Sequence, residues 1–139
     1  MTFHSTTGAF YRDLSSFLDD QLKEYGLPVS YIEVIRILNE KEKATQKDIS
    51  EELALAPSTI TRFVRKLIDR GWVQKTREGR EAYVSLTEKG ERHFKFVERD
   101  YQHAMDALDR LLGGKFRETV GGLAAYGSQQ LQPPKEGRD

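Results

Sequence analysis

The chain has 139 residues, which fits one domain or one core with a dimerising extension, and its 22 basic and 22 acidic side chains leave no formal net charge. It contains no cysteine, which excludes a disulfide scaffold, a zinc–thiolate site, a cysteine nucleophile and a thiol redox sensor. Because no apolar run approaches the ~18 residues of a membrane span and residues 1–10 lack a basic, apolar start, we expect a soluble, cytoplasmic protein without a signal peptide.

Two helices are predicted in the first part of the chain. Apolar side chains at steps of three and four over residues 8–25 indicate an amphipathic helix, which Gly26 ends. Pro28 then stands near the start of a second helix. Apolar residues cover so much of its circumference that we expect it to be mostly buried. The polar run 39–43 ends this second helix.

A short helix, a turn and a further helix follow. Thr45 and Asp48 form a capping-box-like start to a helix of about two turns. Residues 54–56 interrupt it, and Pro57 begins the next helix, which Gly71 ends. One face of that helix is apolar and carries Ile60, Phe63, Val64, Leu67 and Ile68. The other face is polar and basic and carries Ser58, Thr59, Thr61, Arg62, Arg65 and Lys66.

A β-hairpin is predicted next. Residues 72–76 and 82–86 are short β-prone segments, and the turn between them, residues 77–81, contains a glycine. A short helix, a tight turn, a second helix with a polar exposed face, a glycine and a hairpin follow one another in this order. That order is typical of a winged helix-turn-helix, a fold that binds DNA.

A long helix and a weaker last helix complete the chain. Thr87 caps the long helix, which runs about 25 residues to Gly113. Its apolar residues form a heptad seam, typical of a helix that packs against another helix along its length: Phe94, Val97, Tyr101, Ala104, Leu108 and Leu111. The last helix is predicted over residues 115–131, and the tail 132–139 is expected to be disordered.

The net charge of zero conceals an uneven distribution. Residues 58–80, called the basic stretch below, hold seven basic and two acidic side chains. The flanking segments 1–57 and 81–139 carry net charges of −4 and −1. A basic stretch is expected of a surface that binds a polyanion, although taken alone it is also typical of a solvated helix face. Its coincidence with the second helix and the hairpin favours DNA binding.

The helix that begins at Pro57 is the candidate recognition helix. Its first residues are expected at base edges in the major groove, with Arg62 as the best candidate for bidentate contact with guanine. Arg65 and Lys66 are expected to contact phosphates. Candidate contacts at the start of the preceding helix are Thr45, Gln46 and Lys47. On the hairpin, the candidates for an adjacent minor groove or its phosphates are Lys75, Arg77 and Arg80.

Three motifs resemble the multiple-antibiotic-resistance-regulator (MarR) family: LAPSTITRFVRKL at 55–67, DRGWV at 69–73 and VSLTEKG at 84–90. With the flanking helices, the resemblance covers roughly residues 8–131. It implies a dimeric transcriptional regulator whose first and last helices, with the end of the long helix, form the dimer. It also implies that a small-molecule pocket often lies between the dimer and DNA-binding regions. The wing is shorter than is usual in the family, and Arg80 takes the position of the family's arginine.

The predicted fold is therefore mainly α with a small β-hairpin wing, a winged helix-turn-helix with N- and C-terminal dimerisation helices. Its parts are an N-terminal dimerisation helix (1–27), the winged helix-turn-helix (28–87), the long helix with the C-terminal dimerisation helix (88–131) and the tail. The predicted function is that of a sequence-specific regulator, a ligand-responsive repressor that binds a pseudo-palindromic double-stranded DNA site as a homodimer.

A small aromatic or phenolic effector is a further candidate partner. Five aromatic residues could line a pocket for a flat ligand, and equally could be plain core: Phe10, Phe17, Tyr25, Tyr31 and Trp72. We assign no ligand-binding residue on this basis. His4, His93 and His103 are expected to be isolated surface histidines, and neither a metal nor another cofactor is expected.

No catalytic motif is present, so we do not expect an enzyme or a catalytic residue. Two alternatives to a ligand-responsive regulator remain. A winged helix used as a protein-interaction module would show no salt-dependent affinity for DNA. An architectural DNA-binding protein without a ligand would bind DNA with little sequence preference.

Overall fold

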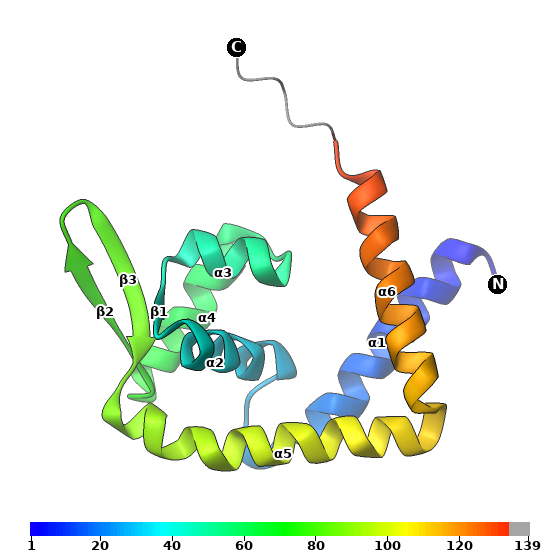
Figure 1. Cartoon of the computed structure of the whole chain (residues 1–139), viewed down its shortest axis with the longest axis horizontal. Helices are drawn as coiled ribbons and strands as arrows, with labels where there is room; N and C mark the ends of the chain where they lie inside the picture. The colour runs from blue at the N-terminus through cyan, green and yellow to red at the C-terminus, as the bar shows by residue number, and fades with distance from the viewer. Residues whose placement is uncertain (134–139) are drawn as a thin grey trace. The chain divides into compact units, whose positions relative to one another are not determined.

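The computed structural model describes residues 1–133, and the predicted mainly α fold with a small β wing is confirmed (Figure 1). Its helices are α1 (Phe3–Gln21), η1 (Lys23–Tyr25, a single 3₁₀ turn), α2 (Val29–Lys41), α3 (Gln46–Leu53), α4 (Pro57–Asp69), α5 (Glu88–Leu112) and α6 (Gly114–Leu131). Its strands are β1 (Lys43–Ala44), β2 (Val73–Glu78) and β3 (Glu81–Leu86). The chain divides into two compact units, residues 1–102 and 103–139. The expected disordered tail lies, from residue 134 on, outside the described residues.

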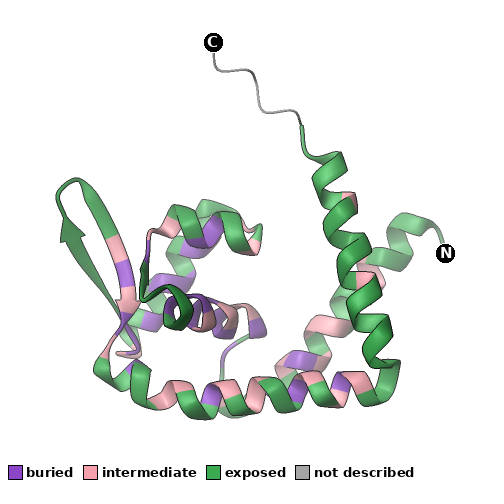
Figure 2. Ribbon diagram, viewed as in Figure 1, coloured by how far each residue is buried: buried purple, intermediate pink, exposed green. Residues whose placement is uncertain are grey.

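The core of the first unit lies among α2, α3, α4 and the base of the hairpin (Figure 2). Ile32 and Leu38 of α2 are buried, as are Ile49 of α3 and Val64 of α4. The apolar face predicted for α4 packs into this core except for Ile68, which is exposed. These contacts fix α4 by one face and leave its opposite face to solvent. None of the helices in residues 1–133 is long and apolar enough to cross a membrane.

The first helix starts at Phe3 rather than at residue 8, and it ends at Gln21. The hydroxyl oxygen of Thr2 accepts a hydrogen bond from the backbone N–H of Ser5 at 3.1 Å, which caps the start. Apolar spacing could not reveal this first turn because its side chains face solvent. The predicted α-helix thus ends four residues earlier than expected, and a 3₁₀ turn follows it. Gly26, whose φ of 62° lies in the left-handed region, ends that turn.

Strand β1 was not predicted. Lys43 pairs with Ser85 of β3, and Ala44 pairs with Val84. The sheet order is β1-β3-β2, with antiparallel neighbours, so β3 is its central strand. A two-residue strand carries no readable alternation of apolar and polar side chains. Its pairing joins the segment before α3 to the base of the hairpin.

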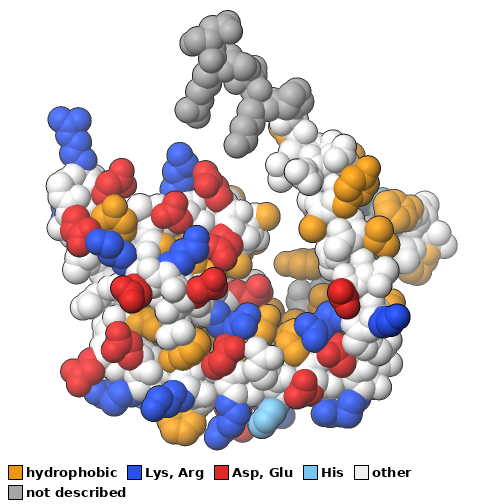
Figure 3. Space-filling view, in the orientation of Figure 1, with side chains coloured by type: hydrophobic (Ala, Val, Ile, Leu, Met, Phe, Trp, Pro, Cys, Tyr) orange, Lys and Arg blue, Asp and Glu red, His pale blue; other side chains and the backbone are white. Residues whose placement is uncertain are grey.

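Helix α5 has the predicted length of 25 residues, and the hydroxyl of Thr87 accepts a hydrogen bond from the N–H of Gly90 at 3.0 Å. Val97 on its seam is buried, whereas Leu111 at the end of the seam is 68% exposed. Helix α6 has no buried residue, and Figure 3 shows hydrophobic side chains along it. Arg117 forms a two-bond ion pair with Asp109, at 2.7 and 2.8 Å.

Candidate nucleic-acid interface

The capping box at the start of α3 is confirmed. The hydroxyl oxygen of Thr45 accepts a hydrogen bond from the N–H of Asp48 at 3.1 Å, and the Asp48 carboxylate accepts one from the N–H of Thr45 at 3.2 Å. The hydrogen bond from the Thr45 backbone N–H lowers the pKa of Asp48. These bonds fix the first turn of α3, where Gln46 and Lys47 are placed.

The turn between α3 and α4 is held by backbone and side-chain bonds. Ala54 adopts a left-handed conformation with φ of 54°, which ends α3. The hydroxyl of Ser50 donates to the carbonyl of Leu55 at 2.6 Å, and the N–H of Leu55 donates to the carbonyl of Ser50 at 3.1 Å. Helix α4 then begins at Pro57, as predicted, and Ala56 provides no side-chain cap.

The outer face of α4 carries the predicted polar and basic residues. Ser58, Thr61, Arg62, Arg65 and Lys66 are all exposed, and Thr59 is half-buried. The guanidinium of Arg62 lies 5.7 Å from the ring centroid of Phe63, and the ammonium of Lys66 lies 5.6 Å from that of Tyr31. Tyr31 and Phe63 stack at 4.0 Å, so this face rests on a packed aromatic pair.

One hydrogen bond joins the two helices of the motif across their exposed ends. The hydroxyl of Thr61 lies 2.9 Å from Oε1 of Gln46 and 3.0 Å from the carbonyl of Pro57. Because Gln46 belongs to the first turn of α3, the bond holds its amide beside the exposed face of α4. The structure therefore brings together Gln46 and Thr61, which the sequence suggested as candidate DNA contacts on two different helices.

The seven cations of the basic stretch have no carboxylate partner among the described residues. Within residues 1–133, no Asp or Glu oxygen lies within 4.0 Å of the charged nitrogens of Arg62, Arg65, Lys66, Lys75, Arg77 or Arg80. Positive charges without a counter-charge raise the local potential and favour the binding of an anion.

Arg70 also has no carboxylate partner among residues 1–133, but its guanidinium is bound to backbone carbonyls. Its Nη1 donates to the carbonyl of Tyr25 at 2.6 Å, and its Nη2 donates to the carbonyl of Gly26 at 3.3 Å. The sequence counted Arg70 with the other cations because charge alone does not show where a side chain points. In the structure this guanidinium binds the linker between α1 and α2.

The hairpin turn is tighter than predicted. It contains Gly79 and Arg80 alone, because Glu78 and Glu81 pair with each other. The φ of Gly79 is 63° and that of Arg80 is not positive, a pattern typical of a type II′ turn. The predicted turn 77–81 was therefore too long, and Arg77 lies within β2, opposite Ala82. In Figure 3 a basic side chain projects from the tip of the hairpin.

The two faces of the hairpin differ in charge. Lys75 and Arg77 lie on the same face as Val73, which packs into the core at the base of the hairpin. On the other face, Glu78 forms an ion pair with Lys43 of β1, whose ammonium also lies 4.6 Å from the Tyr83 ring centroid. Lys43 thus neutralises one of the two glutamates that flank the turn, a role the sequence did not suggest because β1 was not predicted.

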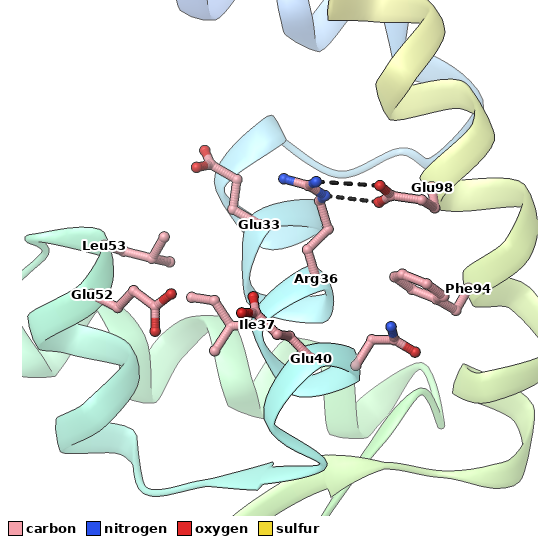
Figure 4. Close-up of a pocket in the computed structure, with 9 residues that line it drawn as sticks. Glu33, Arg36, Ile37, Glu40, Glu52, Leu53, Phe94 and Glu98 are labelled. Atoms are coloured by element: carbon pink, nitrogen blue, oxygen red, sulfur yellow. Dashed lines mark hydrogen bonds and ion pairs between the residues drawn. The ribbon is translucent and has the colours of Figure 1, made fainter. Parts of the chain in front are cut away.

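A cavity of about 410 Å³ lies between α2, the end of α3 and α5 (Figure 4). Its lining combines three apolar residues, four glutamates, one arginine and one asparagine: Glu33, Arg36, Ile37, Asn39, Glu40, Glu52, Leu53, Phe94 and Glu98. None of the five aromatic residues considered as pocket lining belongs to it. Tyr25 instead packs edge-on against the buried Trp72, with ring centroids 6.2 Å apart.

An ion pair forms one wall of the cavity. The guanidinium of Arg36 donates to both carboxylate oxygens of Glu98, at 2.8 and 3.2 Å, and lies 4.0 Å from the Tyr101 ring centroid. The hydrogen bond from Arg36 lowers the pKa of Glu98, and burial raises the pKa of Glu33. In Figure 4 the two dashed bonds join α2 to α5.

Glu98→Gln is expected to lower the free energy of unfolding at pH 7 by about 1–2 kcal/mol, because it removes one charge of a partly buried pair. A depressed pKa means that the ionised Glu98 stabilises the fold above its ordinary value of 4.5, and that this contribution is lost as the pH falls through the lower value in the folded chain. Urea unfolding at pH 7 and pH 3 should therefore show a smaller difference between wild type and variant at pH 3. An equal difference at both pH values would contradict the stabilising role of the ionised Glu98.

The histidines differ from the sequence expectation at one position. His93 is half-buried, and its ring packs in a tilted arrangement against Trp72 with ring centroids 5.2 Å apart. Its Nδ1 lies 2.9 Å from the carbonyl of Lys89. It was expected to be isolated on the surface, and that expectation was wrong. His4 and His103 are exposed.

Comparisons with known proteins agree with this architecture. Residues 27–80 match the model of the MarR family. The HTH-type transcriptional regulator SarZ of Staphylococcus epidermidis is 28% identical in a match that covers 73% of this chain and 80% of SarZ. The solved structure of BpsR from Bordetella bronchiseptica has a TM-score of 0.80 at 14% identity, over 91% of this chain and 93% of BpsR. Reduced AbfR bound to DNA has a TM-score of 0.74 at 21% identity, over 91% and 90% of the two chains.

The family match covers the structural parts that build the candidate interface. Residues 27–80 contain α2, β1, α3, α4, β2 and the hairpin turn. The likeness to the two solved structures, at these identities, shows the fold.

Proposed function

We propose that the chain is a transcriptional regulator of the MarR family, whose model residues 27–80 match. We propose further that it is a homodimeric repressor that binds a pseudo-palindromic site on double-stranded DNA in the cytoplasm. The observation that carries the proposal is the face of α4, whose cations have no carboxylate partner within residues 1–133, next to a hairpin whose cations also have none there. Regulators of this family act by binding DNA and are not enzymes. AbfR, which shares the fold, has been solved on DNA.

The proposed contacts follow from where each side chain lies. The first turns of α4 enter the major groove, where Ser58, Thr59 and Arg62 face base edges. Gln46, held by Thr61, and Lys47 approach from the start of α3. Arg65 and Lys66, one turn further along α4, contact phosphates.

The wing makes the outer contact of each half-site. Arg80 lies in the turn, and Lys75 and Arg77 lie on the core-side face of the hairpin. In the described part of the chain, none of the three has a carboxylate partner. With a two-residue turn and Glu78 neutralised by Lys43, the wing presents positive charge over a short reach. We therefore assign the wing to phosphates at the edge of the minor groove.

Dimerisation is supported by apolar surface that each unit leaves exposed. In residues 1–102, Phe3 and Tyr11 of α1 are exposed; in residues 103–133, Leu111, Leu123 and Tyr126 are exposed. A single chain of this size rarely leaves so many large apolar side chains in water without a partner surface. Sedimentation equilibrium tests the dimer, since the proposal requires twice the mass of one chain at micromolar concentration, and a monomer would contradict it.

A ligand response is the last part of the proposal. The DNA binding of BpsR is regulated by 6-hydroxynicotinic acid. In this chain the candidate effector site is the 410 Å³ cavity, whose size suits a small aromatic molecule. Its four glutamates outnumber its one arginine and repel a negatively charged ligand, so we expect a neutral ring system to bind there more tightly than its carboxylate analogue. A ligand changes DNA affinity only by binding one spacing of the two recognition helices better than another.

Arg65→Ala is expected to weaken binding to all duplexes alike and to flatten the dependence of log affinity on log salt. Each lost phosphate contact removes ~0.9 from the slope, so a dimer that loses two contacts should change by ~1.8. Fluorescence anisotropy between ~50 and ~200 mM salt measures this slope.

The matched control is Arg92→Ala, which removes the same charge from α5, where Arg92 is exposed and paired with Glu88. Its slope should equal that of the wild type. A wild type without any salt dependence would contradict DNA binding and favour a protein-interaction module. Salt-dependent binding without sequence preference would favour an architectural protein.

A further inference from the structure

The carboxyl end of α4 is attached to the α1–α2 linker by one side chain. Arg70 follows the last residue of α4 and donates from two nitrogens of its guanidinium to two successive carbonyls, those of Tyr25 and Gly26, at 2.6 and 3.3 Å. Gly26 is required here by its own backbone, since its φ of 62° is one that other residues rarely adopt. The guanidinium therefore lies against backbone on the linker side of the unit.

Further bonds connect the same end of α4 to α5. The ammonium of Lys89 donates to the carbonyl of Arg70 at 3.0 Å, and the hydroxyl of Thr87 donates to the carbonyl of Gly71 at 2.5 Å. The hydroxyl of Tyr25 in turn donates to Asp100 of α5 at 2.5 Å. All of these residues belong to the unit 1–102. The end of the recognition helix is thus held from the linker and from α5, and Arg70 makes the two bonds to the linker.

We propose that Arg70 is a positioning residue that sets the orientation of α4, and with it the half-site spacing that the dimer recognises, and that it is not a DNA contact. This inference rests on the proposed function. Two bonds from one planar fork restrict both the position and the rotation of the helix end, whereas a single bond leaves rotation free. In a twofold dimer, a rotation of α4 in one subunit is repeated in the other subunit. Both rotations change the distance between the two recognition helices, so a small rotation of each has a doubled effect on that distance.

The experiment uses the full-length protein and duplexes that wild type recovers from a random pool, with the spacer between half-sites kept, shortened or lengthened by one base pair. We expect wild type to bind the original spacing about tenfold more tightly than either altered spacing. Arg70→Lys, which keeps the charge but not the fork, should reduce this ratio to about threefold or less. Arg70→Ala should reduce the ratio to the same extent. Its affinity should depend on salt with the same slope as that of the wild type, because no phosphate contact is lost.

Arg65→Ala is the matched control, since it removes the same charge from α4 itself. It should show the opposite result, a flatter salt slope with the wild-type spacing ratio. Thermal unfolding of each variant establishes that it is folded at the assay temperature, and if Arg70→Ala is not, Arg70→Lys carries the test.

An unchanged spacing ratio in folded Arg70→Lys would overturn the inference and leave the proposed function intact. A flatter salt slope in Arg70→Ala would also overturn it, because it would make Arg70 a phosphate contact. A wild type that recovers no common duplex would overturn both, so failure of the inference alone is distinguishable from failure of the proposed function.

Discussion

Gly90→Ala is expected to lower the free energy of unfolding by about 3 kcal/mol, because α5 crosses the start of the hairpin there without room for a side chain. A Cβ at Gly90 would lie 2.2 Å from the carbonyl oxygen of Trp72 and 3.4 Å from Cβ of Leu86. The obstructing atom is backbone, and it already accepts a hydrogen bond from the N–H of Thr87 at 3.0 Å. The helix propensity gained by alanine, about 1 kcal/mol, does not offset this overlap.

Urea unfolding at pH 7 measures the change, and Gly8→Ala is the matched control within α1. A Cβ at Gly8 would meet only the end of the flexible Arg12 side chain, at 3.2 Å, so this variant should keep or slightly raise the stability. Equal stability of Gly90→Ala and wild type would contradict the close crossing of α5 over Trp72.

Arg62→Ala is expected to have the largest effect on sequence recognition. Loss of one bidentate contact to guanine costs ~1–3 kcal/mol, which corresponds to a loss of ~5–150-fold in affinity for each half-site contact. Arg62 is exposed near the start of α4, has no carboxylate partner in residues 1–133, and rests beside the Phe63 ring. The loss should be confined to duplexes with the preferred base at one position of each half-site.

Competition binding with duplexes substituted at single positions tests this assignment. Relative to wild type, the variant should lose discrimination at one position and keep it elsewhere. The comparison variant Arg65→Ala should lose affinity at every position equally. If Arg62→Ala behaves like Arg65→Ala, Arg62 contacts the backbone and not a base.

The helix-turn-helix could be predicted from the sequence because its signals are local. Thr45 and Asp48 lie three residues apart, and Pro57 and Gly71 mark the limits of α4 through their own backbone preferences. The outer face of α4 follows from the spacing of its buried residues. Each of these features depends on neighbours within one or two turns.

The parts that could not be predicted depend on contacts between distant segments. Arg70 has its partners 44 and 45 positions away along the chain, in the α1–α2 linker, and no spacing rule points to backbone carbonyls. Strand β1 exists only through its pairing with β3, and Lys43 acquires its role beside Glu78 only once that pairing is made. The left-handed Ala54 is likewise dictated by the turn and not by its own preference.

The cavity shows the same dependence. Arg36 and Glu98 are 62 positions apart, so the ion pair that forms one wall has no local signal. Phe94 was predicted as part of a packing seam, and the structure places it at the cavity as well. Aromatic residues considered for ligand binding were chosen by type, whereas the lining is decided by how α2, α3 and α5 meet.

The most direct test of the proposed function is selection of bound duplexes from a random pool by the purified protein at ~150 mM salt, where non-specific binding is weak. A homodimeric winged helix-turn-helix should enrich an inverted repeat whose half-sites lie about ten base pairs apart. Enrichment of that repeat would establish sequence recognition and twofold symmetry together. A folded protein that enriches no sequence would contradict the proposal, and the free cations of α4 and the wing would then serve another partner.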